Sequence, residues 1–357
     1  MVHDRLSNLE SRLLASLHEY RIQEYQLLPY KIKLTMPWET ASAKRYYRHG
    51  MLVKLIINES LSVTGECAPM PEIGTESLEQ AQNALENKLA SWHGKPITAE
   101  LLQDMENFPA SRFALETALL ALRQKQTGQT IAQMLNPKYS PTIITNIMLG
   151  KLDEQLLYKA QQAQADGFSC LKIKLGLKDI ESETQSLLQV LQQLSPSTQI
   201  RLDANKSWSY EQSKWFLNTL KVHLKDDLNR IDSIEEPLSD FNIQEYQALQ
   251  NHTRIALALD ESFCDKISLK HYPVRRLVLK PTAQGGIIKT WQLARLAKRY
   301  NIETIITSSI ETAYGLWPIS YLCAALGSSQ THGLATASWL EDTLITAPEV
   351  KHGIIII

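Results

Sequence analysis

The stretch that decides the fold is Leu171-Lys172-Ile173-Lys174-Leu175. Successive side chains of a β-strand point to opposite faces, so the two lysines share one face and the three apolar residues share the other. If the apolar face packs against helices, both ammonium groups point to the opposite side of the sheet. Two neighbouring positive charges are costly there unless anionic groups balance them. The segment therefore predicts a buried strand that ends in a charged, functional region.

Similar apolar runs recur along the chain and alternate with helical segments. Their C-terminal ends fall near Ile147, Lys174, Asp203, Glu235, Asp260, Lys280, Ser308 and Gly333. Their spacing of about 20 to 30 residues is typical of a strand–loop–helix–loop unit. Eight such units predict an α/β fold in which residues 136–336 form a (β/α)₈ barrel.

The first 135 residues have a different pattern and predict an α+β unit. Strand-like stretches cover 20–34 and 51–62, and apolar residues recur at helical spacing in 1–16, about 77–92 and about 110–125. Ser77 and Gln80 have the spacing of a capping box at the start of one helix. The polar segment 35–45 contains a proline and is expected to be an irregular loop, a candidate lid.

The composition is that of an ordinary globular protein: 357 residues, 44% hydrophobic and 21% charged. The 37 basic and 38 acidic residues give a net charge of −1, which argues against a dedicated nucleic-acid-binding protein. Because the apolar runs are too short for a membrane span and the first residues do not resemble a secretory signal, we expect a cytoplasmic protein without a membrane partner. The four scattered cysteines, Cys67, Cys170, Cys264 and Cys323, are expected to be reduced, buried thiols.

Three consecutive strands are predicted to end in a carboxylate. Asp203, Glu235 and Asp260 are each the first acid after an apolar run, and the ends of barrel strands lie side by side at one rim. Three crowded carboxylates cannot all stay ionised unaided, and a divalent cation resolves the conflict. Oxygen-only donors select a hard ion, so the sequence predicts a Mg²⁺ site at which Mn²⁺ could substitute. We interpret Glu236 and Glu261 as supporting residues rather than ligands.

Lysines are predicted on two sides of this metal, because Lys280 ends the strand that follows Asp260. This arrangement suits removal of a proton from carbon next to a carboxylate: the metal stabilises an enediolate, and a lysine whose pKa is lowered by neighbouring cations takes the proton. Each motif alone also has a structural interpretation, as a solvated strand edge, a turn or a helix N-cap. Their order along the chain favours the functional interpretation.

The motifs together resemble the enolase superfamily, muconate-cycloisomerase subgroup, over nearly the whole chain. In chain order they are Lys172-x-Lys174, Asp203-x-Asn205, Glu235-Glu236-Pro237, Asp260-Glu261-Ser262 and Lys280-Pro281. The resemblance implies a modified TIM barrel and an N-terminal α+β capping domain, residues 1–135, completed by residues 337–357. Two loops of that domain, 35–50 and 65–74, would cover the barrel mouth. Segments 65–71, 201–208, 307–312 and 333–336 are most similar to the o-succinylbenzoate synthase family.

That family resemblance implies a Mg²⁺-dependent syn dehydration of 2-succinyl-6-hydroxy-2,4-cyclohexadiene-1-carboxylate, a small dicarboxylate, in menaquinone or phylloquinone synthesis. Lys174 would remove the proton next to the ring carboxylate and then protonate the departing hydroxyl. Lys280 would stabilise the enediolate by cation–π attraction, and Lys172 would lower the pKa of Lys174 and hold the carboxylate. The implied substrate-binding residues are Arg201, Asn205, Thr307, Ser308 and Gly333.

Other functions remain open. An N-succinylamino acid racemase, or another cycloisomerase or epimerase of the subgroup, would use the same two lysines, Lys174 and Lys280. Residues 333–336 lack the Asp-x-Asp of dipeptide epimerases, which argues against dipeptide substrates. A non-catalytic anion-binding barrel and a Schiff-base aldolase are alternatives from other classes. Arg45 and Arg48 either contact a dianionic substrate or are solvated surface charges, and the oligomeric state is left open.

Overall fold

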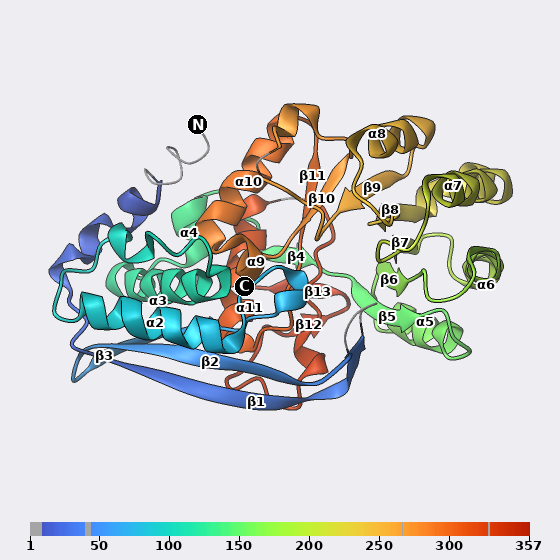
Figure 1. Ribbon diagram of the computed structural model, residues 1–357. Coiled ribbons are helices and arrows are strands. Elements are labelled where there is room, and N and C mark those ends of the chain that lie inside the picture. Colours follow the sequence, from blue (N-terminus) through green and yellow to red (C-terminus); the bar gives the residue numbers. More distant parts are fainter. Residues whose placement is uncertain (1–8, 40–43, 266, 328) are drawn as a thin grey trace.

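The N-terminal part of the chain is an antiparallel sheet covered by helices. The computed structural model describes residues 9–39, 44–265, 267–327 and 329–357. Strands β1 (Glu24–Glu39), β2 (Lys44–Asn58) and β3 (Leu61–Cys67) pair in that order. Helices α2 (Leu78–Trp92) and α3 (Pro109–Thr127) lie against this sheet (Figure 1). A Cβ at Gly65 would lie 1.9 Å from the Ala114 carbonyl oxygen, so glycine is needed where α3 meets β3.

The predicted helices of this unit are confirmed where the structure describes them. Ser77 and Gln80 form the predicted capping box at the start of α2, and α3 is largely buried. The helix expected over 1–16 is helical from residue 9 and continues as η1 (Ala15–Glu19), while residues 1–8 lie outside the described part. The short elements η2 (Pro71–Ile73), η3 (Ala99–Leu102) and α4 (Ile131–Leu135) complete the unit.

The expectation of an irregular loop over 35–45 is wrong for most of that segment, which forms β-strand instead. Strand β1 continues to Glu39 and β2 begins at Lys44, with Trp38 paired to Arg45. The register of the pair is interrupted between Lys33 and Trp38, and this irregularity accommodates Pro37, which cannot donate a ladder hydrogen bond. Residues 40–43 of the predicted loop lie outside the described residues.

The rest of the chain is built on a curled parallel sheet of seven strands with helices outside it (Figure 1). In chain order the elements are β5 (Ile147–Lys151), α5 (Leu156–Ala165), β6 (Cys170–Lys174), α6 (Ile180–Gln193), β7 (Gln199–Asp203), α7 (Tyr210–Leu224), η4 (Lys225–Arg230), β8 (Ile231–Glu235), α8 (Ile243–His252), β9 (Ala256–Leu259), η5 (Leu269–His271), β10 (Arg276–Leu279), α9 (Pro281–Gln284), α10 (Ile287–Arg299), β11 (Glu303–Ile306) and α11 (Ala313–Leu326). The predicted alternation of strands and α-helices is thus confirmed for six of these seven strands, since β9 is followed only by the short η5. The first predicted strand was misplaced, since β5 begins at Ile147 rather than ending there.

The eighth predicted strand is reduced to two β-bridges. His332 bridges to Thr145 and Gly333 bridges to Thr307, both in the parallel sense. The His332 carbonyl accepts a hydrogen bond from Asn146 N (2.8 Å), and Gly333 N donates to Ile306 O (2.9 Å). These two residues therefore contact both edge regions of the sheet, although a turn that follows immediately ends the extended segment.

The C-terminal segment contacts both parts of the molecule. Strands β12 (Val350–Lys351) and β13 (Ile354–Ile356) form a small antiparallel sheet with β4 (Thr142–Ile144). Before them, η6 (Ala337–Trp339) leads to Leu340, which bridges to Leu34 of β1, and Glu341 forms an ion pair with Lys33 at 2.7 Å. The boundaries 1–135 with 337–357, and 136–336, stay a prediction.

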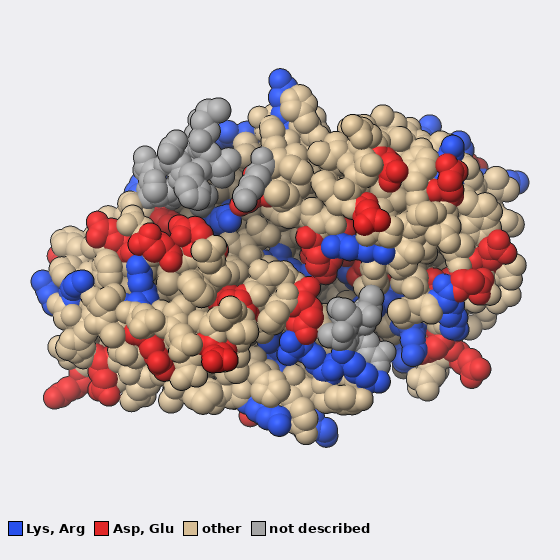
Figure 2. Space-filling model, in the orientation of Figure 1, with Lys and Arg blue, Asp and Glu red and all other residues tan. Residues whose placement is uncertain are grey.

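One large apolar core runs through both parts, and a small cluster of Ile32, Leu34, Ile310 and Leu340 joins β1 to the segment after β11. All four cysteines are free, and three are buried as predicted, but Cys264 is only half-buried because it lies in a loop after β9. Acidic and basic side chains are interspersed on the face shown in Figure 2. Among the described residues, no helix combines the length and apolar character that crossing a membrane requires.

Candidate active site

The carboxyl ends of the parallel strands meet at one cavity that is open to solvent. All the predicted site residues line it: Lys172, Lys174, Arg201, Asp203, Asn205, Glu235, Asp260, Lys280, Thr307, Ser308 and Gly333. Strand register explains the grouping, because Lys174 of β6 is paired with Asp203 of β7, which is paired with Glu235 of β8. Residues at one level of adjacent parallel strands present their side chains side by side.

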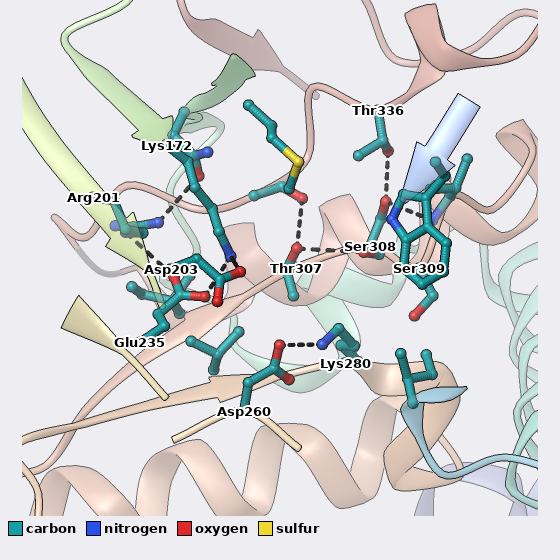
Figure 3. A pocket seen from close by; sticks show the side chains of 18 of the residues that line it. Lys172, Arg201, Asp203, Glu235, Asp260, Lys280, Thr307, Ser308, Ser309 and Thr336 are labelled. Carbon is teal, nitrogen blue, oxygen red and sulfur yellow. Dashed lines mark hydrogen bonds and ion pairs between the residues drawn. The ribbon is translucent and has the colours of Figure 1, made fainter. Parts of the chain in front are cut away.

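On one side of the cavity, Lys172 lies between two carboxylates (Figure 3). Its Nζ is 3.0 Å from Asp203 Oδ2 and donates a hydrogen bond to Glu235. Although burial lowers the pKa of Lys172, the two carboxylates outweigh it and raise that pKa. Burial raises the pKa of Glu235, whereas Lys172 and Lys174 overcome the same effect of burial and lower the pKa of Asp203.

Across the cavity, Lys280 donates a hydrogen bond to Asp260 and lies 3.6 Å from Glu261 (Figure 3). These two acids raise the pKa of Lys280 against the opposing effect of burial. Burial, together with repulsion from Glu261, raises the pKa of Asp260. The cavity therefore holds two separate groups of opposite charges, one from strands β6 to β8 and one from β9 and β10.

Lys174 has a different environment from the other two lysines. Its Nζ lies 5.6 Å from the ring centroid of Trp38, which comes from β1 of the N-terminal unit. Burial lowers the pKa of Lys174, and Lys172 and Lys280 act in the same direction against Asp203. Lys172 therefore lowers the pKa of Lys174, which is the direction that the family resemblance implies.

The three predicted metal ligands line one cavity, but they do not form a coordination sphere. Among the described residues, no group of three His, Cys, Asp or Glu side chains lies close enough to hold a metal ion. Asp203, Glu235 and Asp260 are instead paired with lysine ammonium groups. The donor chemistry still fits a hard cation, since all three are carboxylates at the ends of neighbouring strands. Burial and repulsion from Glu261, with a smaller effect of Glu235, raise the pKa of Asp260.

Two predicted residues support the cavity from below and beside it. The buried Arg201 donates to Asp232 Oδ2 (2.8 Å), Asn146 Oδ1 (3.1 Å) and the Thr331 carbonyl (3.2 Å). Its guanidinium thus bonds to protein groups, and its role as a substrate-binding residue stays a prediction. Asn205 adopts a left-handed conformation (φ +50°) and bonds both the side chain and the carbonyl of Asp203.

The far wall of the cavity carries hydroxyl groups (Figure 3). Thr307 Oγ1 donates to the Gly333 carbonyl (3.2 Å), and Ser308 Oγ bonds Thr336 Oγ1 (2.5 Å). The buried Ser309 hydroxyl has no hydrogen-bond partner within the described residues. Ser309, Thr336 and Trp38 also line the cavity. They lie in the segments 307–312, 333–336 and 35–45 noted in the sequence, but they were not predicted as site residues, because their position depends on the path of the chain after the strands.

Glu236 has the supporting role expected of it. Its carboxylate accepts hydrogen bonds from Asp260 N and Ser262 N, both at 2.8 Å, and so holds the loop that carries Asp260. Both interpretations of Arg48 were wrong, because it is buried and donates to backbone carbonyls. Arg45 pairs with Glu72 at 2.6 Å and thereby joins the two predicted lid segments.

Comparisons with known proteins agree with this geometry. A family model described as Enolase C-terminal domain-like matches residues 155–357, and one described as MenC, N-terminal domain, matches residues 22–122. The o-succinylbenzoate synthases of Yersinia pseudotuberculosis serotype O:1b and of Yersinia pestis are each 30% identical over 88% of this chain and 91% of the relative. The chain belongs to the o-succinylbenzoate synthase family.

Solved structures share the fold of this o-succinylbenzoate synthase family member at lower identity. The L-Ala-D/L-Glu epimerase from Bacillus subtilis superposes with a TM-score of 0.84 at 19% identity, covering 94% of this chain and 96% of its own. The N-succinyl Arg/Lys racemase from Bacillus cereus gives a TM-score of 0.83 at 18% identity, covering 94% and 93%. The curled parallel sheet with an N-terminal unit is therefore an enolase-type fold.

Proposed function

We propose that this enzyme, a carbon–oxygen lyase of the o-succinylbenzoate synthase family, performs its chemistry in the cavity at the strand ends. The proposed reaction is the dehydration of 2-succinyl-6-hydroxy-2,4-cyclohexadiene-1-carboxylate to 2-succinylbenzoate in menaquinone or phylloquinone synthesis. The observation that carries the assignment is the convergence of Lys174, Lys280 and three strand-end carboxylates on one cavity. The same proposal includes a cytoplasmic location. It also includes a closed barrel of eight units over residues 136–336, whose last strand ends near Gly333, and a capping domain formed by 1–135 and 337–357.

Asp203, Glu235 and Asp260 would hold Mg²⁺. When bound, this ion supplies positive charge next to the substrate carboxylate, where negative charge develops as the neighbouring proton leaves. Lys172 lies at the same carboxylates, and its raised pKa keeps it cationic, so it can hold the substrate carboxylate. Buried charges of opposite sign in fixed positions stabilise such a transition state more strongly than water does.

Lys174 would act as the base and then as the acid. Its lowered pKa increases the fraction of neutral amine that can accept the proton next to the carboxylate. The resulting ammonium donates the same proton to the departing hydroxyl on the same face, which makes the elimination syn. Lys280, whose pKa is raised, stays cationic and stabilises the enediolate from the other side by cation–π attraction.

The hydroxyl-bearing wall would receive the succinyl chain. Thr307, Ser308 and the backbone at Gly333 provide polar groups there. The Ser309 hydroxyl supports this placement, since a buried hydroxyl with no partner in the described part of the chain is suited to a ligand oxygen. Arg201 and Asn205 would shape the cavity next to the metal ligands through Asn146, Asp232 and Asp203.

A racemase of N-succinylamino acids is the second candidate, because Lys174 and Lys280 lie in the same cavity and could serve as two bases. An ultraviolet assay of the cyclohexadiene substrate, with EDTA and then with added Mg²⁺, tests the main proposal. We expect dehydration that EDTA stops and Mg²⁺ restores. Parallel incubation of N-succinylamino acids in deuterated solvent tests the alternative. Exchange without dehydration would replace the dehydratase assignment by the racemase.

A further inference from the structure

The segment that follows β11 forms part of the cavity wall in a strained conformation. Ser308, Ser309 and Ile310 line the cavity, and Ile310 has φ of +60°. A β-branched residue is rarely found in this left-handed region, because its side chain crowds the backbone. Some other part of the structure must therefore hold the segment in place.

Arg48 of β2 provides one of these contacts. It is 1% exposed, and its Nε donates to the Ile310 carbonyl at 3.0 Å. Its other nitrogens donate to the carbonyls of Pro69 (2.9 Å) and Ala68, in the loop after β3. One buried guanidinium thus joins β2 and the loop after β3 to Ile310, the strained residue of the wall.

Glu66 of β3 provides the second contact, on the other side of the same segment. Its buried carboxylate accepts hydrogen bonds from Thr312 N (2.9 Å), Thr312 Oγ1 (2.8 Å) and Gly315 N (2.7 Å). These N–H groups belong to the first turn of α11, where a negative charge is favourable. A Cβ at Gly315 would lie 2.8 Å from Glu66 Oε2, so this position suits glycine.

We propose that Arg48 and Glu66, the wall pair, are positioning residues that set substrate affinity by holding residues 308–310 against the succinyl end of the substrate; this rests on the proposed function. The cation binds the Ile310 carbonyl, and the anion binds the N–H groups of Thr312 and Gly315 just beyond the segment, so the two contacts hold the C-terminal end of the segment. Neither side chain lines the cavity. Loss of Arg48 lets Ile310 relax toward negative φ, which turns the neighbouring hydroxyls away from the substrate.

The chain contains a matched control for the wall pair. Arg112 of α3 donates to the Gly285 carbonyl, and Glu116 accepts from Ile287 N and Ile288 N (3.1 Å) at the start of α10. The chemistry is similar, a half-buried arginine on a carbonyl and a buried glutamate on helix N–H groups. None of these contacted backbone residues lines the cavity.

The test compares Arg48→Met, Arg48→Lys, Glu66→Gln and the control Glu116→Gln in the full chain with Mg²⁺. Steady-state dehydration, thermal melting, and inhibition by 2-succinylbenzoate and by benzoate are measured. We expect R48M and E66Q to raise KM about tenfold. The inhibition constant of 2-succinylbenzoate should rise by a similar factor, and that of benzoate should change less than about twofold. R48K keeps the buried charge but not the donor to Ile310, and should raise KM about threefold. It carries the test if R48M does not fold.

E116Q should lower the melting temperature and leave KM within about twofold of the wild type. The proposal is overturned if folded R48M or R48K keeps the wild-type KM, or if E116Q raises KM as much as R48M does. It is also overturned if the inhibition constant of benzoate rises by the same factor as that of 2-succinylbenzoate. A wild-type chain that does not dehydrate the substrate contradicts the proposed function instead. In that case the ratio of the two inhibitors still reports on the wall pair.

A double substitution tests whether Arg48 acts through the backbone of Ile310. Glycine adopts φ of +60° without strain, so in an Ile310→Gly background the wall should keep its path without Arg48. We expect R48M to raise KM by no more than about threefold relative to I310G alone, against about tenfold in the wild type. An undiminished effect in the glycine background would contradict the strain-based account.

Discussion

The ammonium group of Lys174 lies 5.6 Å from the ring centroid of Trp38. The lysine comes from β6 of the parallel sheet and the tryptophan from β1 of the N-terminal unit. The ring favours the charged amine by cation–π attraction, whereas burial and Lys172 favour the neutral amine. Burial is the largest of these effects on the pKa and shifts it downward, so the neutral amine that accepts a proton is more populated than in an ordinary lysine.

Replacement of this lysine tests the base directly. We expect Lys174→Ala to fold and to lose turnover by about three powers of ten or more, since the substitution removes the amine proposed to accept and return the proton. Turnover and the exchange of the substrate proton with deuterated solvent are measured together. Lys221→Ala, an exposed lysine of α7, serves as the control. Substantial activity in K174A would exclude Lys174 as the base.

The pH profile of kcat/KM should report the same group. A base must be neutral to accept the proton, so activity rises as pH increases through the pKa of Lys174. Burial, aided by Lys172, lowers that pKa from the ordinary 10.5, and the rise should therefore be centred below pH 10.5. A profile of kcat/KM in saturating Mg²⁺ measures it. A midpoint at or above the ordinary value would contradict this environment for Lys174.

The strand ends were predictable from the sequence because each apolar run closes on a charged residue, as at Asp203 and Glu235. Parallel pairing then brings such residues to one level without further information. The pairing of Lys172 with both carboxylates was not predictable, because it depends on side-chain reach across strands. The same holds for Arg48, which reads as a surface charge until the chain path surrounds it with carbonyl groups.

The short length of the last strand could not be predicted from the sequence either. The run that ends near Gly333 has the spacing of the other strands, yet the described part of it forms two single bridges, at His332 and Gly333, rather than a ladder. A Cβ at Gly333 would lie 2.6 Å from Thr307 Oγ1, so the close approach that makes these bridges depends on a tertiary contact. Hydrophobic periodicity records burial and does not record such contacts.

Removal of one proposed metal ligand should abolish both activity and the stabilisation by Mg²⁺. Asp260→Asn keeps the shape of the side chain and removes its charge. The wild type should gain about 2.7 kcal/mol of unfolding free energy at a Mg²⁺ concentration one hundred times Kd, because only the folded chain binds the ion. Thermal melting with and without Mg²⁺, and with NaCl at equal ionic strength, measures the gain. Asp226→Asn, on the exposed η4, is the control.

If D260N still gains stability from Mg²⁺ to the wild-type extent, then Asp260 is not a ligand. If the wild type gains none, the three carboxylates do not form a Mg²⁺ site. Activity measured in the same samples separates a lost ligand from a lost fold, because a folded D260N without activity retains its melting transition.

The acid sensitivity of the fold should depend on one buried histidine. His332 is 1% exposed, and its Nδ1 accepts a hydrogen bond from Ile306 N at 3.0 Å. Burial, with a smaller effect of Arg201, lowers its pKa from 6.5 to about 3. Between these values the unfolded chain binds one more proton than the folded chain, so stability falls as pH decreases, by about 1.4 kcal/mol per pH unit.

His332→Asn keeps an acceptor for the Ile306 N–H and removes the titration. We expect the difference in unfolding free energy between H332N and the wild type to shift in favour of the variant as pH falls from about 6 to about 4, by up to about 1.4 kcal/mol per unit. Urea unfolding at each pH measures this difference. The exposed His223→Asn should show no such shift. Parallel stability curves for H332N and the wild type would mean that His332 takes up its proton in the folded state near the ordinary pKa, and that its burial beside Arg201 does not keep it neutral.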